Sequence, residues 1–230
     1  DSDEAFFENA DPSTQVATRH SDPIDLKVPV IIAGLGSTNV AKRNWDGLAK
    51  GAALSGTIEV IGENVCGMDH DSVYSNGKVQ RSPDMEFRVN SFKEMWDGKH
   101  GEIAVQTNVE DLRGGVDDYV MSNLDVNVIE RKWGQGAKAI GGEVRLDTLE
   151  RALELKQRGY LVVPDPEDPD VQEAYRDGAF KTFERHSRVG FPQFKDFVED
   201  VEQLREKGAK YVFLKTGAYR PEVVAFTMKV

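Results

Sequence analysis

Two lysines stand where predicted strands end, in positions where they could bind an anionic ligand. The run 126–132 is rich in β-branched residues and ends on Lys132, and the run 211–215 ends on Lys215. In parallel α/β folds, ligands bind at the carboxyl ends of the strands. A lysine there can pair with a phosphate, a carboxylate or a flavin carbonyl. We therefore predict that Lys132 and Lys215 are catalytic. The plainer interpretation of each is a solvated strand end.

The segment after Lys132 combines an amide, charged groups and glycines. Glycines allow a ligand to approach the backbone closely, and the side chains could hold a dicarboxylate or its imine. The predicted substrate-binding residues are Gln135, Lys138, Gly141, Gly142 and Glu143.

Other polar and glycine residues follow three further predicted strands. Gln106 ends one of them, and its amide can both donate to and accept from the pyrimidine edge of a flavin. The predicted cofactor-binding residues are Gly34, Leu35, Gly36, Ser37, Gly62, Glu63 and Gln106, together with the two lysines. For Glu63, a local cap or salt bridge is an equally weighted interpretation.

Strand and helix patterns alternate along the chain. Strands are predicted at 28–33, 58–61, 103–106, 126–132 and 211–215, with a doubtful sixth at 160–163. Helices are predicted at 40–55, 84–96, 116–124, 147–158 and 197–207. Such alternation predicts a parallel sheet with helical crossovers. An eight-stranded barrel usually needs about 250 residues, so an open doubly wound domain and an incomplete barrel both fit.

Composition restricts the classes of partner. The 230 residues are 39% hydrophobic and 30% charged, and the net charge is −11, which argues against nucleic acid or an anionic membrane. No apolar run approaches the roughly 20 residues of a membrane span. The single Cys66 excludes an intrachain disulfide and a cysteine-only metal site, and the four histidines lack metal-binding spacing, so no metal is predicted. We expect a cytoplasmic protein. The acidic start without methionine suggests a fragment of a longer chain.

One segment carries a family resemblance. The pattern Glu130-x-Lys132-x-x-Gln135-Gly136-Ala137-Lys138, with Gly141-Gly142 after it, resembles the FMN-binding synthase domain of the glutamate synthase large-subunit family. That family includes stand-alone glutamate-synthase-like and N-methylglutamate synthase subunits. Weaker similarities occur in the same order at 30–41, 50–53, 62–63, 106, 113–116, 185–187 and 213–215. The chain departs from the family at Ala139-Ile140, where Pro-Gly is usual. It also lacks the amidotransferase region, the cluster cysteines and the late phosphate loops.

The resemblance implies a TIM (β/α)8-type barrel that is incomplete in this chain, with about five to six βα units in residues 28–230 after an N-terminal extension, 1–27. It implies FMN as cofactor, and an iron–sulfur cluster in the full protein although this chain has no ligand cysteines for one. The implied reaction reduces 2-iminoglutarate, formed from 2-oxoglutarate and ammonia or an amine, to glutamate or an N-substituted glutamate. Amidotransferase and electron-donor subunits or domains, in a hetero- or homo-oligomer, are the implied partners.

Two other functions also fit the residues. A barrel enzyme could use one of the strand-end lysines to form a Schiff base with a carbonyl substrate. A non-catalytic barrel fragment or assembly subunit would have the fold without a whole site. A bound flavin would favour the first hypothesis, and borohydride trapping of a carbonyl substrate would favour the Schiff base.

Overall fold

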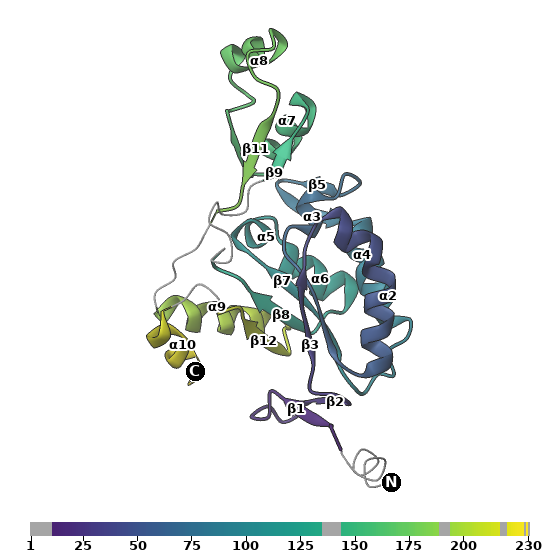
Figure 1. Ribbon diagram of the computed structural model, residues 1–230. Helices are drawn as coiled ribbons and strands as arrows, with labels where there is room; N and C mark the ends of the chain where they lie inside the picture. The colour runs from purple at the N-terminus through teal and green to yellow at the C-terminus, as the bar shows by residue number, and fades with distance from the viewer. Residues whose placement is uncertain (1–10, 135–143, 189–193, 217–219, 228, 230) are drawn as a thin grey trace.

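A computed structural model of the chain describes residues 11–134, 144–188, 194–216, 220–227 and 229 (Figure 1). Its main sheet has five strands: β3 (Ile31–Leu35), β4 (Ile58–Ile61), β7 (Glu102–Thr107), β8 (Val128–Arg131) and β12 (Tyr211–Leu214). The order is β12-β8-β7-β4-β3, and every neighbouring pair is parallel. The prediction of five parallel strands, adjacent in chain order, is therefore confirmed.

Nine helices occur in the described residues. They are α2 (Asn39–Ser55), α3 (Val65–Met68), α4 (Pro83–Lys93), α5 (Val109–Arg113), α6 (Val116–Leu124), α7 (Leu149–Gln157), α8 (Pro169–Arg176), α9 (Phe194–Lys207) and α10 (Pro221–Thr227). Side chains of α2, α4, α6 and α9 form one core with the strands, including Trp45, Phe92, Val120 and Leu204. These helices therefore cover one face of the sheet.

The predicted barrel is wrong. The five parallel strands form an open sheet in the described chain, with β3 and β12 as its edges, and the other sheets are antiparallel. The doubtful strand predicted at 160–163 does exist, as β10 (Leu161–Val163), but it joins a separate antiparallel sheet. Periodicity indicated a strand there without indicating its partner, which is why the sequence overestimated the parallel sheet.

A small unit lies in the chain between β8 and α9. It consists of β9 (Val144–Leu146), β10 and β11 (Phe183–His186), in the order β10-β11-β9, with α7 and α8. Figure 1 shows it projecting beyond the main sheet, next to β5 and α3. Arg158 attaches it to α3, because its guanidinium donates to the carbonyls of Gly67 at 2.8 Å and Asp69 at 2.7 Å. Of the segment 185–187, where a weak family similarity was noted, residues 185 and 186 belong to the strand β11.

Two hairpins complete the fold. In the first, β1 (Thr14–Val16) pairs with β2 (Ile24–Leu26), and Ile24 and Leu26 are buried against the sheet face opposite the helices. In the second, β5 (Val73–Ser75) pairs with β6 (Lys78–Arg81). Its turn has Asn76 at φ 50° and Gly77 at φ 72°, which are the positive angles of a two-residue hairpin turn.

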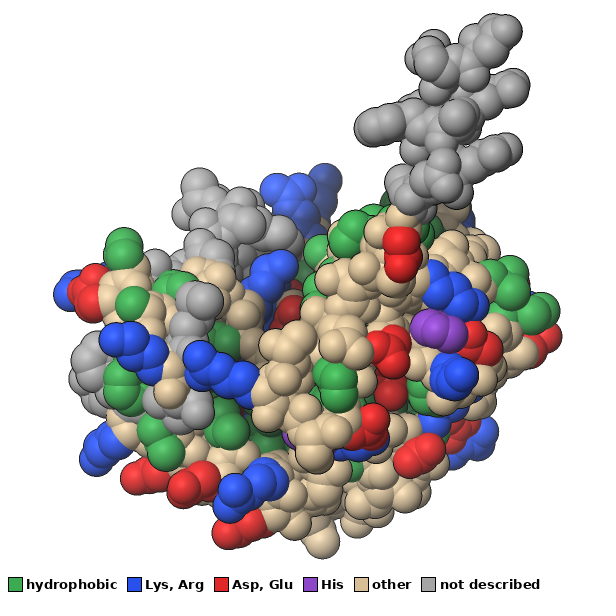
Figure 2. Space-filling model, turned by 90° about the horizontal axis from the view of Figure 1, so that it is seen from below, with side chains coloured by type: hydrophobic (Ala, Val, Ile, Leu, Met, Phe, Trp, Pro, Cys, Tyr) green, Lys and Arg blue, Asp and Glu red, His purple; other side chains and the backbone are tan. Residues whose placement is uncertain are grey.

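The molecular surface carries charges of both signs. Lys, Arg, Asp and Glu side chains are interspersed over the face seen in Figure 2, without a continuous basic area. In the part of the chain that the structure describes, no helix is both long enough and apolar enough to cross a membrane.

Candidate functional site

The two predicted lysines lie side by side at the carboxyl edge of the sheet. Phe213 on β12 pairs with Glu130 on β8, and the ladder continues with the Lys215 amide donating to the Arg131 carbonyl at 2.9 Å. Side chains two residues apart on a strand share a face. Lys132 and Lys215 therefore lie on the face that carries Glu130 and Phe213, one row nearer the carboxyl edge.

The two lysines have different partners. Lys132 Nζ is 2.8 Å from Oε1 of Glu63, and the two side chains are 18% and 17% exposed. This ion pair connects the ends of β8 and β4, which agrees with the salt-bridge interpretation of Glu63. Lys215 is half-buried, and no carboxylate of the described chain lies within ion-pair distance of it. Lys215 is thus the better placed of the two to receive an anionic ligand.

Gln106 lies beneath these lysines on the same face. It is 2% exposed, its Nε2 donates to Oε1 of Glu130, and a Cβ added at Gly34 would lie 3.0 Å from that nitrogen. Gly34 and Glu130 are three strands apart, or roughly 14 Å in a flat sheet. The Gln106 amide, reaching out from β7, therefore lies between Gly34 of β3 and Glu130 of β8 on this face. Glu130 and the lysines form the accessible layer above the buried amide.

The other predicted loop residues have packing roles. A Cβ at Gly36 would lie 2.9 Å from the Glu63 carbonyl oxygen, and one at Gly62 would lie 2.4 Å from the Gly36 nitrogen. Both glycines therefore allow β3 and β4 to approach closely, rather than holding backbone open for a ligand. Leu35 accepts at its carbonyl from the Gly62 amide at 2.9 Å. Ser37 faces away, into a polar cavity of about 630 Å³ lined also by Lys42. Of these predicted residues, only Gly34 borders Gln106.

The predicted substrate-binding residues, Gln135, Lys138, Gly141, Gly142 and Glu143, lie outside the described residues. The described part of the site therefore consists of Gly34, Glu63, Gln106, Glu130, Lys132 and Lys215.

A buried polar network behind the carboxyl edge was not predicted from the sequence. Asp111 accepts from the backbone amides of Asn64 at 3.0 Å and Asn108 at 3.2 Å. Burial raises the pKa of Asp111 to about 7, although these hydrogen bonds oppose the rise. Tyr160 of the small unit donates to Oδ1 of Asn64 at 3.3 Å. The network therefore joins the small unit to the edge of the sheet. The spacing of Asn108 and Asp111 is a capping box, which a closer inspection of the sequence would have found.

Arg185 of β11 belongs to the same region. It is 2% exposed, and its guanidinium lies 5.1 Å from the centre of the Tyr160 ring. Burial lowers the pKa of Arg185, and the opposing electrostatic effects of Tyr160, Asp111 and Glu110 offset this only in part. Its Nη1 donates to Ser187 Oγ at 2.8 Å, and its Nε has no hydrogen-bond partner in the part of the chain that the structure describes. The junction of the small unit and the sheet is thus rich in charge but nearly closed to solvent.

The described residues contain no group of three histidine, cysteine, aspartate or glutamate side chains that could hold a metal ion. Cys66 is buried, and burial raises the pKa of its thiol well above the usual value. Neither observation adds a metal or a reactive thiol to the site.

No family model matches this sequence, and searches of the curated proteins and of the solved structures return no match.

Proposed function

We propose that this chain binds FMN at the carboxyl edge of its parallel sheet and acts as the flavin-bearing part of a glutamate-synthase-type oxidoreductase. The proposed substrate is 2-iminoglutarate, formed from 2-oxoglutarate and ammonia or an amine. The observation that carries the proposal is the placement of Lys132 and Lys215 on neighbouring strands, on one face, above Gln106 and Glu130.

The residues on this face suit the polar edge of a flavin ring. Lysine ammonium groups can donate to ring carbonyls, and a charge near N1 and O2 stabilises reduced flavin. Glu130 accepts from the Gln106 amide and fixes its orientation. When bound, FMN would supply hydride transfer. The lysines would hold and orient the ring, and Lys215 would do so without first breaking an ion pair among the described residues.

Substrate binding would add a second requirement for positive charge. A dicarboxylate needs cations or hydrogen-bond donors for each carboxylate. Lys132 is one such cation, because its ammonium has three N–H donors and the contact with Glu63 at 2.8 Å uses one of them. An amidotransferase and an electron-donor subunit or domain would supply ammonia and electrons.

The test is flavin binding by the purified chain, followed by a redox titration of bound FMN. We expect Lys215→Met and Lys132→Met each to lower the flavin potential, since each removes a charge that stabilises reduced flavin. The expected loss is on the order of 1–3 kcal/mol for a charged hydrogen bond.

Lys210→Met is the matched control. Lys210 precedes β12 at the opposite end of the same strand, where it pairs with Asp22, so its loss should leave the potential unchanged. The proposal is wrong if the chain does not bind FMN, or if neither strand-end variant shifts the potential. Borohydride trapping of 2-oxoglutarate on Lys215 would instead support the Schiff-base alternative.

A further inference from the structure

The small unit contains a buried arginine whose charge is not paired within the described chain. Arg185 lies on the same side of β11 as the core residue Phe183 and is 2% exposed. Its guanidinium donates to Ser187 Oγ at 2.8 Å, but among the described residues its buried Nε has no partner and no carboxylate lies within ion-pair distance. Buried charges are normally paired, so Arg185 needs a role that outweighs the cost of burying it.

A second arginine, three residues further along the chain, already has its partners. Arg188 Nη1 lies 2.8 Å from both carboxylate oxygens of Glu110 and donates to the Gly159 carbonyl at 2.7 Å. These contacts attach the end of β11 to α5. Arg188 therefore has a structural role, and that role leaves the guanidinium of Arg185 unused.

Arg185 lies close to the carboxyl edge of the main sheet. Its guanidinium is 5.1 Å from the centre of the Tyr160 ring, and the Tyr160 hydroxyl donates to Asn64 Oδ1 at 3.3 Å. Asn64 directly follows Glu63, which pairs with Lys132, and the charge of Glu63 also acts on Arg185. The small unit therefore brings a cation to the part of the edge where Lys132 lies.

The contact between the small unit and α3 is mainly polar. The unit has a core of its own, against which Met68 of α3 packs. Its attachment to α3 uses hydrogen bonds from Arg158 and from Arg151, which donates to the Met68 carbonyl at 2.6 Å. Polar interfaces of this size allow the two parts to move relative to one another. Such motion gives a small anion access to Arg185.

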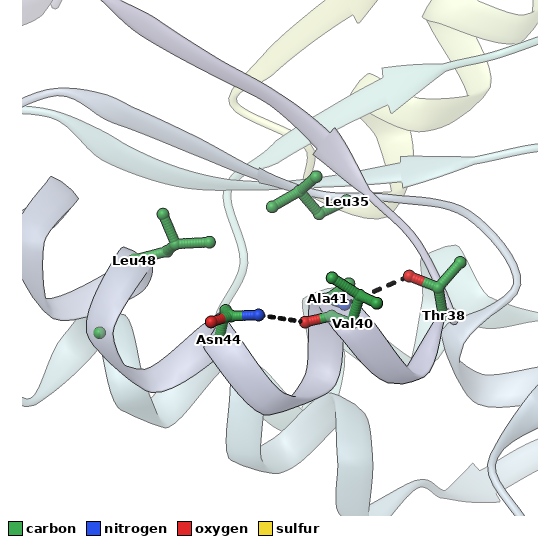
Figure 3. Close-up of a pocket in the computed structure, with 7 residues that line it drawn as sticks. Leu35, Thr38, Val40, Ala41, Asn44 and Leu48 are labelled. Atoms are coloured by element: carbon green, nitrogen blue, oxygen red, sulfur yellow. Dashed lines mark hydrogen bonds between the residues drawn. The ribbon is translucent and has the colours of Figure 1, made fainter.

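Two other cavities of the described chain suit an anion less well. Figure 3 shows the groove of about 570 Å³ beside α2, and the lining residues labelled there are all uncharged: Leu35, Thr38, Val40, Ala41, Asn44 and Leu48. The polar cavity of about 630 Å³ that Ser37 lines has charges of both signs, with Lys42, Arg145 and Arg151 beside Asp69, Asp71, Asp84 and Asp147. Neither cavity offers an anion an unpaired, buried cation.

We propose that Arg185 binds one carboxylate of the substrate, as the residue that the small unit adds to the site at the sheet edge. A guanidinium binds a carboxylate through two parallel N–H donors, and the Nε of Arg185 is available as one of them. A bound carboxylate would also neutralise the buried charge. The identity of the substrate, 2-oxoglutarate or its imine, rests on the proposed function, in which Lys132 takes the other carboxylate.

Thermal unfolding with added ligand tests the proposal, because a ligand that binds only the folded chain raises its Tm. The full chain is measured with 2-oxoglutarate, and with inorganic phosphate and sodium chloride at equal ionic strength for comparison, first without FMN and then with it. We expect 2-oxoglutarate to raise the Tm of the wild-type chain and to leave that of Arg185→Met unchanged. Arg176→Met is the matched control, since Arg176 is an exposed arginine of α8 in the same unit, and it should respond as the wild type does.

Arg185→Lys keeps the charge and loses the paired donors. Its dissociation constant for 2-oxoglutarate should rise by roughly tenfold, the loss expected for one charge-assisted hydrogen bond. Isothermal titration calorimetry measures this change. An unchanged dissociation constant would contradict binding through the guanidinium fork.

The stability of the variants without ligand separates a binding role from a packing role. Replacing an unpaired buried charge with an apolar side chain is neutral or stabilising, so ligand-free Arg185→Met should have a Tm no lower than that of the wild type. A lower Tm assigns Arg185 to packing and overturns the proposal. So does a wild-type chain that 2-oxoglutarate stabilises neither with nor without FMN, equal stabilisation by phosphate, or a response that survives in Arg185→Met. If the chain does not bind FMN, the proposed function fails alone, and an Arg185-dependent response to 2-oxoglutarate still supports the carboxylate site.

Discussion

Arg131 and Lys132 are consecutive residues, yet the two faces of the sheet use their charges in opposite ways. Arg131 points to the helix side, is 1% exposed, and pairs with Asp117 at 2.9 Å and Asp200 at 2.8 Å. Burial would lower its pKa, but the two carboxylates reverse this and raise it. Lys132 points to the other face and forms an ion pair with Glu63, in which both side chains are partly exposed.

A cation at a strand end has a structural role when all its hydrogen-bond donors are used by the protein, as in Arg131. It can bind a ligand when some of its donors remain, as in Lys132. The guanidinium of Arg131 is held by α6 and α9 through Asp117 and Asp200 and also donates to Thr107 Oγ1 at 2.6 Å. It has little remaining capacity for a ligand. The ammonium of Lys132 has three donors, so a ligand can still bind it.

The largest predicted effect on stability comes from removing the guanidinium group of Arg131. Arg131→Met leaves Asp117 and Asp200 unpaired, and Asp117 is buried. We expect the free energy of unfolding to fall by about 3–5 kcal/mol, as for other buried ion pairs that lose one partner. Urea denaturation monitored by circular dichroism measures it.

The control is Arg113→Met, which removes an exposed arginine at the end of α5 and should change stability by less than about 0.5 kcal/mol. Equal effects of the two variants would contradict the structural role of Arg131.

A smaller effect should come from Glu59, a buried carboxyl group. Glu59 lies on β4 between Ile58 and Val60 and is fully buried, and among the described residues neither of its carboxylate oxygens has a hydrogen-bond partner. Burial raises its pKa from 4.5 to about 7. The folded chain therefore favours the protonated form. Its contribution to stability is complete below about pH 4.5 and is lost as the pH rises through 7.

We expect Glu59→Gln to match the wild type in stability near pH 4 and to exceed it at pH 8, by on the order of 1–3 kcal/mol. Unfolding is measured for both chains across this pH range, because their difference isolates Glu59 from Asp111 and the other titrating groups. A difference that does not change with pH would show that the Glu59 carboxyl is not held protonated.

The smallest predicted effect on stability concerns the ion pair of Lys132 with Glu63. Lys132→Met removes a single, partly exposed ion pair, so stability should change by no more than about 1 kcal/mol. Glu63→Gln should behave alike, and the double variant should show little extra loss beyond either single one. Denaturation curves of the three variants provide the measurement. A loss as large as that of Arg131→Met would mean that Lys132 is a structural cation.

The sequence predicted the parallel sheet because local patterns determine it. The strand predicted at 58–61 coincides with β4, and the helix predicted at 116–124 coincides with α6. The strand predicted at 28–33 begins later, at Ile31, since Pro29 has no amide to donate to a ladder. The small unit was missed because β9 and β11 are short strands that pair across a long stretch of chain.

The candidate site was predictable only in part. A strand ending on a lysine indicated where Lys132 and Lys215 lie, because strand direction fixes the edge. It did not indicate that Arg131 would be enclosed by α6 and α9, which depends on tertiary packing. The glycines after β3 and β4 suggested a ligand loop, whereas Gly36 and Gly62 allow two backbones to meet. A glycine in the sequence indicates that another group can approach the backbone closely, but not whether that group is a ligand or a neighbouring strand.

The position of the small unit has a consequence for the order of folding. Tyr211 of β12 pairs with Val128 of β8, so this contact closes a long loop, while β3, β4, β7 and β8 follow one another at shorter separations. Loop-closure entropy makes distant pairings late. The small unit shortens this loop if it forms first, because Arg185 pairs with Val144 and brings its entry and exit together. We therefore expect the first four strands to assemble early, and β12 to join them only after the small unit has folded.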